Sequence, residues 1–206
     1  LIRHITPLEK ERISDPEAAL DGRPLRLSSV RVCSPIPHPE QDIICLGVNY
    51  AAHADESAQF DRKAFLLDRK KATYFSKRAY QTSGPDDLIP SYPELVTSLD
   101  YEAELAVIIG RDCKNVCERD AAACIFGYTV LNDVSARNLQ TEHNQWYFGK
   151  SLDGFTPMGP CIVTEDEIPY PPALSISSTV NGELRQNSNT KYLLHSISEI
   201  IAELSQ

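Results

Sequence analysis

The sequence has no excess of positive charge and no long apolar run. Its 206 residues hold 20 Lys and Arg against 29 Asp and Glu, which gives a formal net charge of −9. Binding to a nucleic-acid backbone needs a basic face, so nucleic acid is not an expected partner. The longest uninterrupted apolar run, residues 121–126, is far shorter than the roughly 20 residues of a membrane-spanning helix. We therefore predict a protein without a membrane partner.

Cysteine is present, but not in a pattern that predicts a disulfide framework or a zinc site. None of the six cysteines forms a C-x-x-C pair or a zinc-type spacing with histidine, and we expect no signal peptide. Free thiols in a cytoplasmic protein are expected, with a mitochondrial location left open. Also missing are the glycine-rich dinucleotide fingerprint, the phosphate-binding P-loop and the nucleophile elbow of serine hydrolases.

The pattern of apolar residues predicts a β-rich α+β fold made of many short strands and a few helices. Asn181-Gly182 is a strong hairpin signal between two of these strands. Ser135 is expected to begin a helix as its N-cap. Strands are expected over residues 43–48, 101–109, 128–132, 161–164, 175–180 and 183–186, and helices over 119–126, 135–146 and 197–204.

An acidic strand is the first segment with chemical content. Side chains alternate along a strand, so Glu102 and Glu104 share one face, about 6–7 Å apart at the backbone. Two carboxylates at this spacing suit a hard cation such as Mg²⁺, although this stretch alone favours a solvated strand face. Asp133 follows a later strand and is either a helix cap or a third metal ligand.

Four further side chains have both a chemical and a plain explanation. His53 and Glu56 are neighbours on a helical turn, which is how a general base is built but is also common on surfaces. Lys150 lies between small residues and could reach a carboxylate or an enolate oxygen, or lie exposed in a turn. Lys77, after Tyr74-Phe75, has the same two explanations.

Taken in order, these segments resemble the fumarylacetoacetate hydrolase family. The similarity runs from about residue 35 to residue 206, and the ordered combination is more specific than any single motif. The matching residues are Gly47, Asn49, Tyr50, His53, Glu56, Tyr74-Phe75-Ser76-Lys77, Asp100-Tyr101-Glu102-Ala103-Glu104-Leu105, Gly127-Tyr128-Thr129, Asn132-Asp133-Val134-Ser135-Ala136-Arg137, Gln140, Trp146, Gly149-Lys150-Ser151, Asp153, Phe155, Pro157, Gly159-Pro160 and Val163-Thr164.

The resemblance implies a fold, a cofactor and a set of site residues. The fold is a mixed β-sandwich roll that is usually a homodimer, and the cofactor is Mg²⁺ or Mn²⁺, sometimes Ca²⁺. The implied metal ligands are Glu102, Glu104 and Asp133. The implied catalytic residues are His53, Glu56 and Lys150, and the implied substrate-binding residues are Arg137, Gln140 and Lys77.

The resemblance also implies an activity on a small 2-oxo acid. The leading prediction is a metal-dependent hydrolase that cleaves a C–C bond in an acylpyruvate or a related β-diketo acid. The same site suits an oxaloacetate decarboxylase or a 2-hydroxydienoate isomerase or tautomerase. An inactive metal-binding fragment is the alternative outside enzymes.

Two departures from the family pattern shape the expected domain organisation. Asn138 stands where the family commonly has Asp. The chain also starts at Leu1 and stops in a predicted helix at Gln206, without the family's later strands and their Gly-Thr-Pro loop. We therefore expect truncation at both ends, with residues 1–34 a remnant of an N-terminal domain and linker and 35–206 a catalytic domain that lacks its C-terminal strands.

Overall fold

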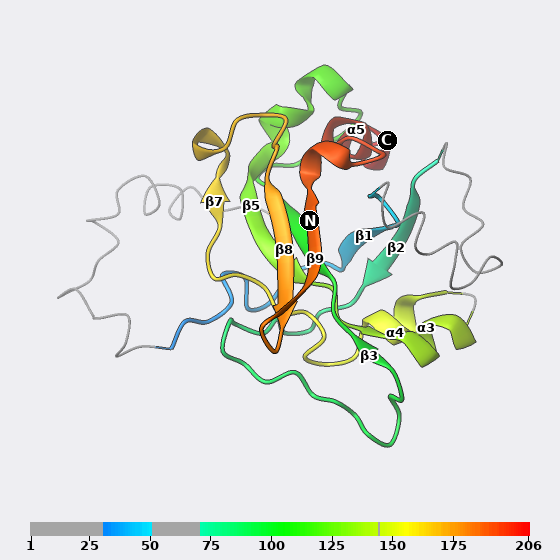
Figure 1. Cartoon of the computed structure of the whole chain (residues 1–206). Helices are drawn as coiled ribbons and strands as arrows, with labels where there is room; N and C mark the ends of the chain where they lie inside the picture. The colour runs from blue at the N-terminus through cyan, green and yellow to red at the C-terminus, as the bar shows by residue number, and fades with distance from the viewer. Residues whose placement is uncertain (1–30, 51–70, 144) are drawn as a thin grey trace.

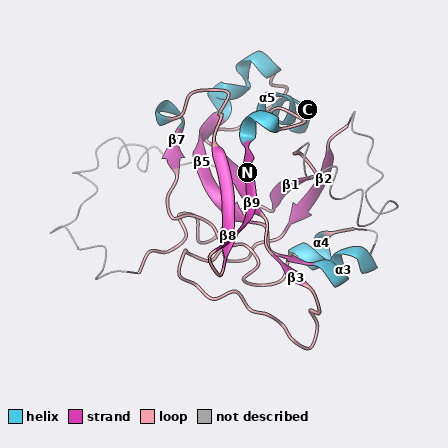
Figure 2. Cartoon of the chain, in the orientation of Figure 1, coloured by secondary structure: helices cyan, strands magenta, loops and turns pink. Residues whose placement is uncertain are grey.

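The computed structural model describes residues 31–50, 71–143 and 145–206. These parts of the chain are rich in strands and carry only short helices, which confirms the predicted β-rich α+β class (Figures 1 and 2). The strands are β1 (Ile43–Gly47), β2 (Thr73–Lys77), β3 (Leu99–Asp100), β4 (Ala103–Ile109), β5 (Ile125–Asn132), β6 (Ser135–Ala136), β7 (Val163–Thr164), β8 (Ser175–Val180) and β9 (Glu183–Asn189). The helices are α3 (Arg137–Glu142), α4 (Tyr147–Lys150) and α5 (Ile197–Leu204), with 3-10 turns η2 (Glu118–Cys124), η3 (Glu165–Glu167) and η4 (Thr190–Tyr192).

The central element is an antiparallel sheet in the order β4-β5-β7. Apolar side chains of β4, among them Leu105 and Val107, pack against Ile197 and Ile201 of α5. Gly127 of β5 pairs with Thr164 of β7, and a Cβ on this glycine would lie 2.3 Å from a backbone oxygen of β7. The close approach of β7 therefore depends on glycine at this position.

A second strand pair, β1-β2, forms one wall of the cavity described below. Ile43 pairs with Lys77 at one end and Gly47 with Thr73 at the other. Trp146 covers this pair, because its ring lies 5.3 Å from that of Phe75 in an edge-to-face contact. A Cβ on Gly47 would lie 2.2 Å from the Trp146 ring, so the strand and the indole touch directly.

The C-terminal part follows the sequence prediction closely. The hairpin β8-β9 turns at Asn181 and Gly182, whose φ angles of 53° and 81° fit the primed turn that Asn-Gly favours. Helix α5 begins with a capping box, in which Ser196 and Glu199 satisfy each other's backbone N–H groups. No helix in the described part of the chain is long and apolar enough to cross a membrane.

The predicted helix over 119–126 is shorter in the structure and of the 3-10 type. Only Glu118–Cys124 is helical, and β5 begins at Ile125 instead of residue 128. Ile125 is buried beside α5 and pairs with Ile109 across an irregular step of the ladder. Burial in the sheet therefore outweighs the helical preference of the alanine-rich segment.

The predicted helix over 135–146 is wrong at its start and in its length. Ser135 belongs to β6, where it pairs with Asp100 of β3, and its hydroxyl donates to the Asp133 carbonyl at 2.9 Å. Ala136 is the N-cap of α3, which ends at Glu142. Local hydrogen bonds of serine compete with helix formation, and here they keep the chain extended for two further residues.

Candidate functional site

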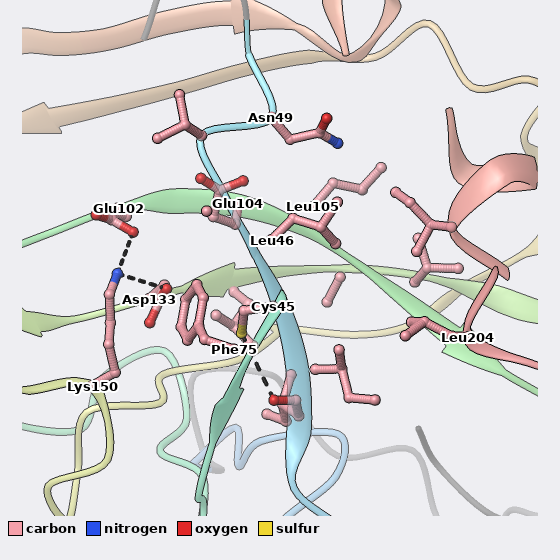
Figure 3. Close-up of a pocket in the computed structure, with 18 of the residues that line it drawn as sticks. Cys45, Leu46, Asn49, Phe75, Glu102, Glu104, Leu105, Asp133, Lys150 and Leu204 are labelled. Carbon is pink, nitrogen blue, oxygen red and sulfur yellow. Dashed lines mark hydrogen bonds and ion pairs between the residues drawn. The ribbon is translucent and has the colours of Figure 1, made fainter. Parts of the chain in front are cut away.

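A cavity of about 1150 Å³ lies between β1, β4 and α5. Its two ends differ in character (Figure 3). One end is apolar, with side chains such as Leu46, Leu105 and Leu204. The other end carries Asp100, Glu102, Glu104, Asp133, Arg137, Gln140 and Lys150. The structure thus brings six of the nine predicted site residues to one cavity (Glu102, Glu104, Asp133, Arg137, Gln140 and Lys150).

The carboxylates are placed by the pairing of β4 with β5. Glu104 lies in β4 opposite Leu131, and Glu102 comes just before the strand. The Glu102 carbonyl accepts from the Asp133 amide at 2.8 Å, and the Glu102 amide donates to the Asn132 side chain at 3.0 Å. These contacts hold Glu102 and Asp133 side by side where β4 begins and β5 ends.

The Lys150 ammonium lies between two of these carboxylates. Its Nζ is 2.7 Å from Glu102 Oε2 and 2.8 Å from Asp133 Oδ2 (Figure 3). Lys150 comes from the end of α4, and it is only 2% exposed. A buried ammonium is tolerated because two anions compensate its charge.

Lys77 contacts the other oxygen of Asp133. Its Nζ is 2.8 Å from Asp133 Oδ1 and donates hydrogen bonds to the carbonyls of Val134 and Lys150. The side chain is fully buried, and Lys77 is not among the residues that line the cavity. Its predicted contact with substrate therefore stays a prediction, whereas its contact with Asp133 is a feature of the structure.

Arg137 ties a further carboxylate to the site. Its guanidinium is 2.6 Å from Asp100 Oδ2 and 2.7 Å from Glu102 Oε1, and it donates to Gln140 Oε1 at 2.9 Å. Asp100 is a site residue for which the sequence predicts no separate role. Its spacing of two residues from Glu102, and four from Glu104, is the alternation that puts side chains on one strand face, and it could have identified Asp100.

Burial and charge move the pKa values of these groups in different directions. Burial, followed by the charges of Glu102 and Asp133, raises the pKa of Glu104 to about 8. Burial also acts to raise the pKa of Asp133, but Lys77 and Lys150 outweigh it and lower that pKa. For Lys150, burial is outweighed by Asp133 and Glu102, which raise its pKa and keep it protonated.

The donor set fits a divalent cation, although the carboxylates are not yet arranged around one. Asp133 Oδ1 is buried and accepts no hydrogen bond among the described residues, since the Lys77 contact is an ion pair without hydrogen-bond geometry. The carboxylates of Asp133, Glu102 and Glu104 are the hard oxygen ligands that Mg²⁺ or Mn²⁺ prefers. In the described ranges no three acidic, histidine or cysteine side chains lie close enough to hold a metal ion. Lys150 occupies the space between Glu102 and Asp133, so its ammonium would have to move when an ion binds.

The predicted pair His53 and Glu56 lies outside the described residues.

All six cysteines are free thiols. Cys45 lines the cavity, and burial raises the pKa of its thiol well above the usual range, so it is no nucleophile at neutral pH.

Comparison with known proteins identifies the family of the chain. Residues 42–206 match the family model described as fumarylacetoacetate (FAA) hydrolase, C-terminal. The chain is 41% identical over 180 residues to the oxaloacetate tautomerase YisK of Bacillus subtilis, covering 87% of this chain and 58% of that protein. It is 38% identical over 209 residues to a mitochondrial oxaloacetate tautomerase, fahd2, of Xenopus laevis, covering 100% of this chain and 63% of that protein.

A solved structure extends the comparison to the fold. It is the maleylpyruvate hydrolase of Sphingobium sp. SYK-6 in complex with manganese(II) and pyruvate. The TM-score is 0.72 at 32% sequence identity, with 95% of this chain and 66% of that chain covered. The chain thus spans about three fifths of the length of the curated relatives named above. Its sequence, its fold and its carboxylate-lysine cluster together show that the chain belongs to the fumarylacetoacetate hydrolase family.

Proposed function

We propose that the protein converts a small 2-oxo acid through its enol or enolate form, with the tautomerisation of oxaloacetate as the reaction to test first. The cluster at the polar end of the cavity carries this proposal, because it combines three carboxylates with the cations of Lys150 and Arg137. The two relatives at 41% and 38% identity, both named oxaloacetate tautomerases, favour this reaction over the others.

Glu102, Glu104 and Asp133 would hold a divalent cation, Mg²⁺ or Mn²⁺. When bound, such an ion would supply electrostatic stabilisation for negative charge that develops on the 2-oxo oxygen of the substrate. The neighbour with manganese(II) and pyruvate supports a metal and a 2-oxo acid in one site of this fold.

Lys150 and Arg137 would bind and orient the substrate. Lys150 remains protonated because the adjacent carboxylates raise its pKa, so its ammonium can donate a hydrogen bond to an enolate oxygen. Arg137 presents a planar group that suits a substrate carboxylate, and Asp100 and Gln140 fix its orientation. Both side chains line the cavity, where they can meet the same ligand.

Tautomerisation moves a proton between carbon 3 and the 2-oxygen, so it also needs a side chain that accepts and returns a proton. The predicted pair His53 and Glu56 suits this role, with the carboxylate orienting the imidazole. The pair lies outside the described residues. The proposal assigns the proton transfer to His53 and the charge stabilisation to Lys150.

Hydrolysis of an acylpyruvate is the second candidate. The similarity to a maleylpyruvate hydrolase favours it. Cleavage leaves a pyruvate-type enolate, which Lys150 would stabilise as it does in the first reaction, but a water molecule must also be activated for attack on the distal carbonyl.

The predicted homodimer and the cytoplasmic or mitochondrial location are further parts of the proposal. Gel filtration tests the homodimer, and cell fractionation tests the location.

One experiment separates these reactions. The protein is incubated with Mg²⁺ or with EDTA and offered oxaloacetate, acetylpyruvate and a 2-hydroxydienedioate, while enol absorbance and the products are followed. We expect Mg²⁺-dependent loss of the oxaloacetate enol, and its absence in Glu102→Gln. The control is Glu183→Gln, which changes an exposed glutamate on β9 that pairs with Arg185. If all three substrates stay unchanged, or Glu102→Gln is fully active, the proposed function is wrong.

A further inference from the structure

Lys77 differs from the other charged side chains described at the site, because it contacts Asp133 and Lys150 without lining the cavity itself. Its side chain is 0% exposed, and it is absent from the cavity lining that Asp133 and Lys150 share. It comes from the end of β2, whereas Asp133 follows β5 and Lys150 ends α4. One ammonium group therefore connects three separate segments of the chain.

The contacts of Lys77 surround its ammonium with three oxygens. It donates hydrogen bonds to the Val134 carbonyl at 3.2 Å and to the Lys150 carbonyl, and it forms an ion pair with Asp133 Oδ1 at 2.8 Å. A buried cation is costly unless such partners surround it, and the carboxylate and the two carbonyls provide them. Because these partners are all protein groups and Lys77 does not line the cavity, the structure gives it no contact with a ligand there.

The two oxygens of Asp133 are consequently different. Oδ1 is paired with Lys77 at the back, and Oδ2 is paired with Lys150, which lines the cavity. The contact with the Lys150 carbonyl also ties the backbone of Lys150 to the same ammonium. Lys77 thus restrains both the orientation of the Asp133 carboxylate and the backbone position from which the Lys150 side chain extends.

We propose that Lys77 is a positioning residue, which fixes Asp133 and Lys150 relative to each other and does not itself contact substrate. This inference rests on the proposed function of the cavity. It gives the contact between Lys77 and Asp133 Oδ1 the role that outer hydrogen-bond partners have at metal sites, where they orient the ligands. Lys150 can move when an ion binds, and Lys77 holds Asp133 in place meanwhile.

The test compares Lys77→Met with Arg78→Met. The first change removes the buried ammonium and keeps a side chain of similar length. The second removes a neighbouring cation that is 59% exposed and pairs with Asp42. For each folded variant, the Mn²⁺ dissociation constant is measured by electron paramagnetic resonance, and kcat and KM are measured on the substrate that the wild type converts.

We expect Lys77→Met to weaken Mn²⁺ binding and to lower kcat about 10- to 100-fold, with KM changed less than about threefold, because loss of an orienting partner has effects of this size. Arg78→Met should match the wild type. If Lys77→Met does not fold, Lys77→Gln replaces it with the same expected split. A rise in KM at unchanged kcat would show direct substrate contact and overturn the proposal, as would unchanged Mn²⁺ affinity and unchanged kinetics. A wild type that binds no Mn²⁺ and converts no substrate would contradict the proposed function itself.

Discussion

Lys150 Nζ lies 2.8 Å from Asp133 Oδ2, in the space where a metal ion shared by Asp133 and Glu102 would bind. The same nitrogen contacts Glu102 at 2.7 Å, so the Lys150 ammonium links the two carboxylates. Metal binding and the Lys150 ion pairs are therefore alternatives at Glu102 and Asp133. Several measurable consequences follow from this competition and from the packing around it.

Replacing Lys150 with Met should make the protein dependent on divalent cations for stability. The change leaves Glu102 and Asp133 close together without their shared cation, and removing one partner of a buried pair costs about 3–5 kcal/mol. Urea unfolding in EDTA should show this loss, and millimolar Mg²⁺ should recover much of it in the variant. Lys191→Met, at an exposed lysine on η4, is the control. A variant as stable as the wild type in EDTA would argue against the buried pair.

Replacing Arg137 with Lys should weaken substrate binding although the charge is kept. A lysine cannot contact Asp100, Glu102 and Gln140 at once, as the guanidinium does. We expect KM for the 2-oxo acid to rise about tenfold, in line with about 1.4 kcal/mol for one charge-assisted contact. Steady-state kinetics measure it, and an unchanged KM would remove Arg137 from the substrate site.

Replacing Gly149 with Ala should destabilise the fold next to Lys150. A Cβ at this position would lie 2.5 Å from the Gln140 amide nitrogen and 2.8 Å from the Ala136 carbonyl oxygen, so the backbone of α4 must move away from α3. Overpacking of this kind costs about 1–3 kcal/mol. The comparison variant is Gly182→Asn in the β8-β9 turn, where the new Cβ meets nothing within 4 Å and the only cost is the strain of a φ of 81°, which Asn tolerates better than other side chains. Equal melting temperatures for the two variants would contradict the predicted clash.

The capping box of α5 should make stability depend on pH through Glu199. Hydrogen bonds from the backbone and the hydroxyl of Ser196 lower the pKa of Glu199 in the folded protein. A lowered folded pKa means that the stabilisation is present above the unfolded pKa of about 4.3 and is lost as the pH falls through the folded pKa. The side chain is exposed, so solvent screening keeps the effect below about 1 kcal/mol.

Glu199→Gln isolates this effect, because glutamine keeps the capping hydrogen bond but does not titrate. The difference in unfolding free energy between wild type and Glu199→Gln should be present above the unfolded pKa of about 4.3 and should fade as the pH falls through the lower folded pKa, where the carboxylate becomes protonated. A difference that stays constant over this range would show that the charge of Glu199 contributes nothing.

The elements that the sequence predicts well are those with a local cause. The turn at Asn181-Gly182 follows from backbone preferences, and α5 follows from its apolar spacing and the Ser196 cap. The grouping of Glu102 and Glu104 follows from strand alternation alone. Each of these features depends on residues close together in the sequence.

The features that the sequence could not provide come from distant contacts. Ser135 is of a residue type that favours helix N-caps, yet its pairing with Asp100 makes it part of a strand. Nothing near Lys77 in the sequence reveals that it is buried against Asp133, 56 residues later, because that contact exists only after β2 and β5 are packed. The family resemblance supplied the assignment of Asp133, Arg137 and Gln140 to one site, which spacing alone left open.

The most direct test of this account is a titration of the protein with Mn²⁺, followed by electron paramagnetic resonance. The wild type and Glu183→Gln should each bind one ion per chain, whereas Glu104→Gln should bind it about 10- to 100-fold more weakly, because a hard oxygen ligand is lost. Equal affinity in Glu104→Gln, or no bound ion in the wild type, would contradict the assignment of this cavity as a divalent-metal site.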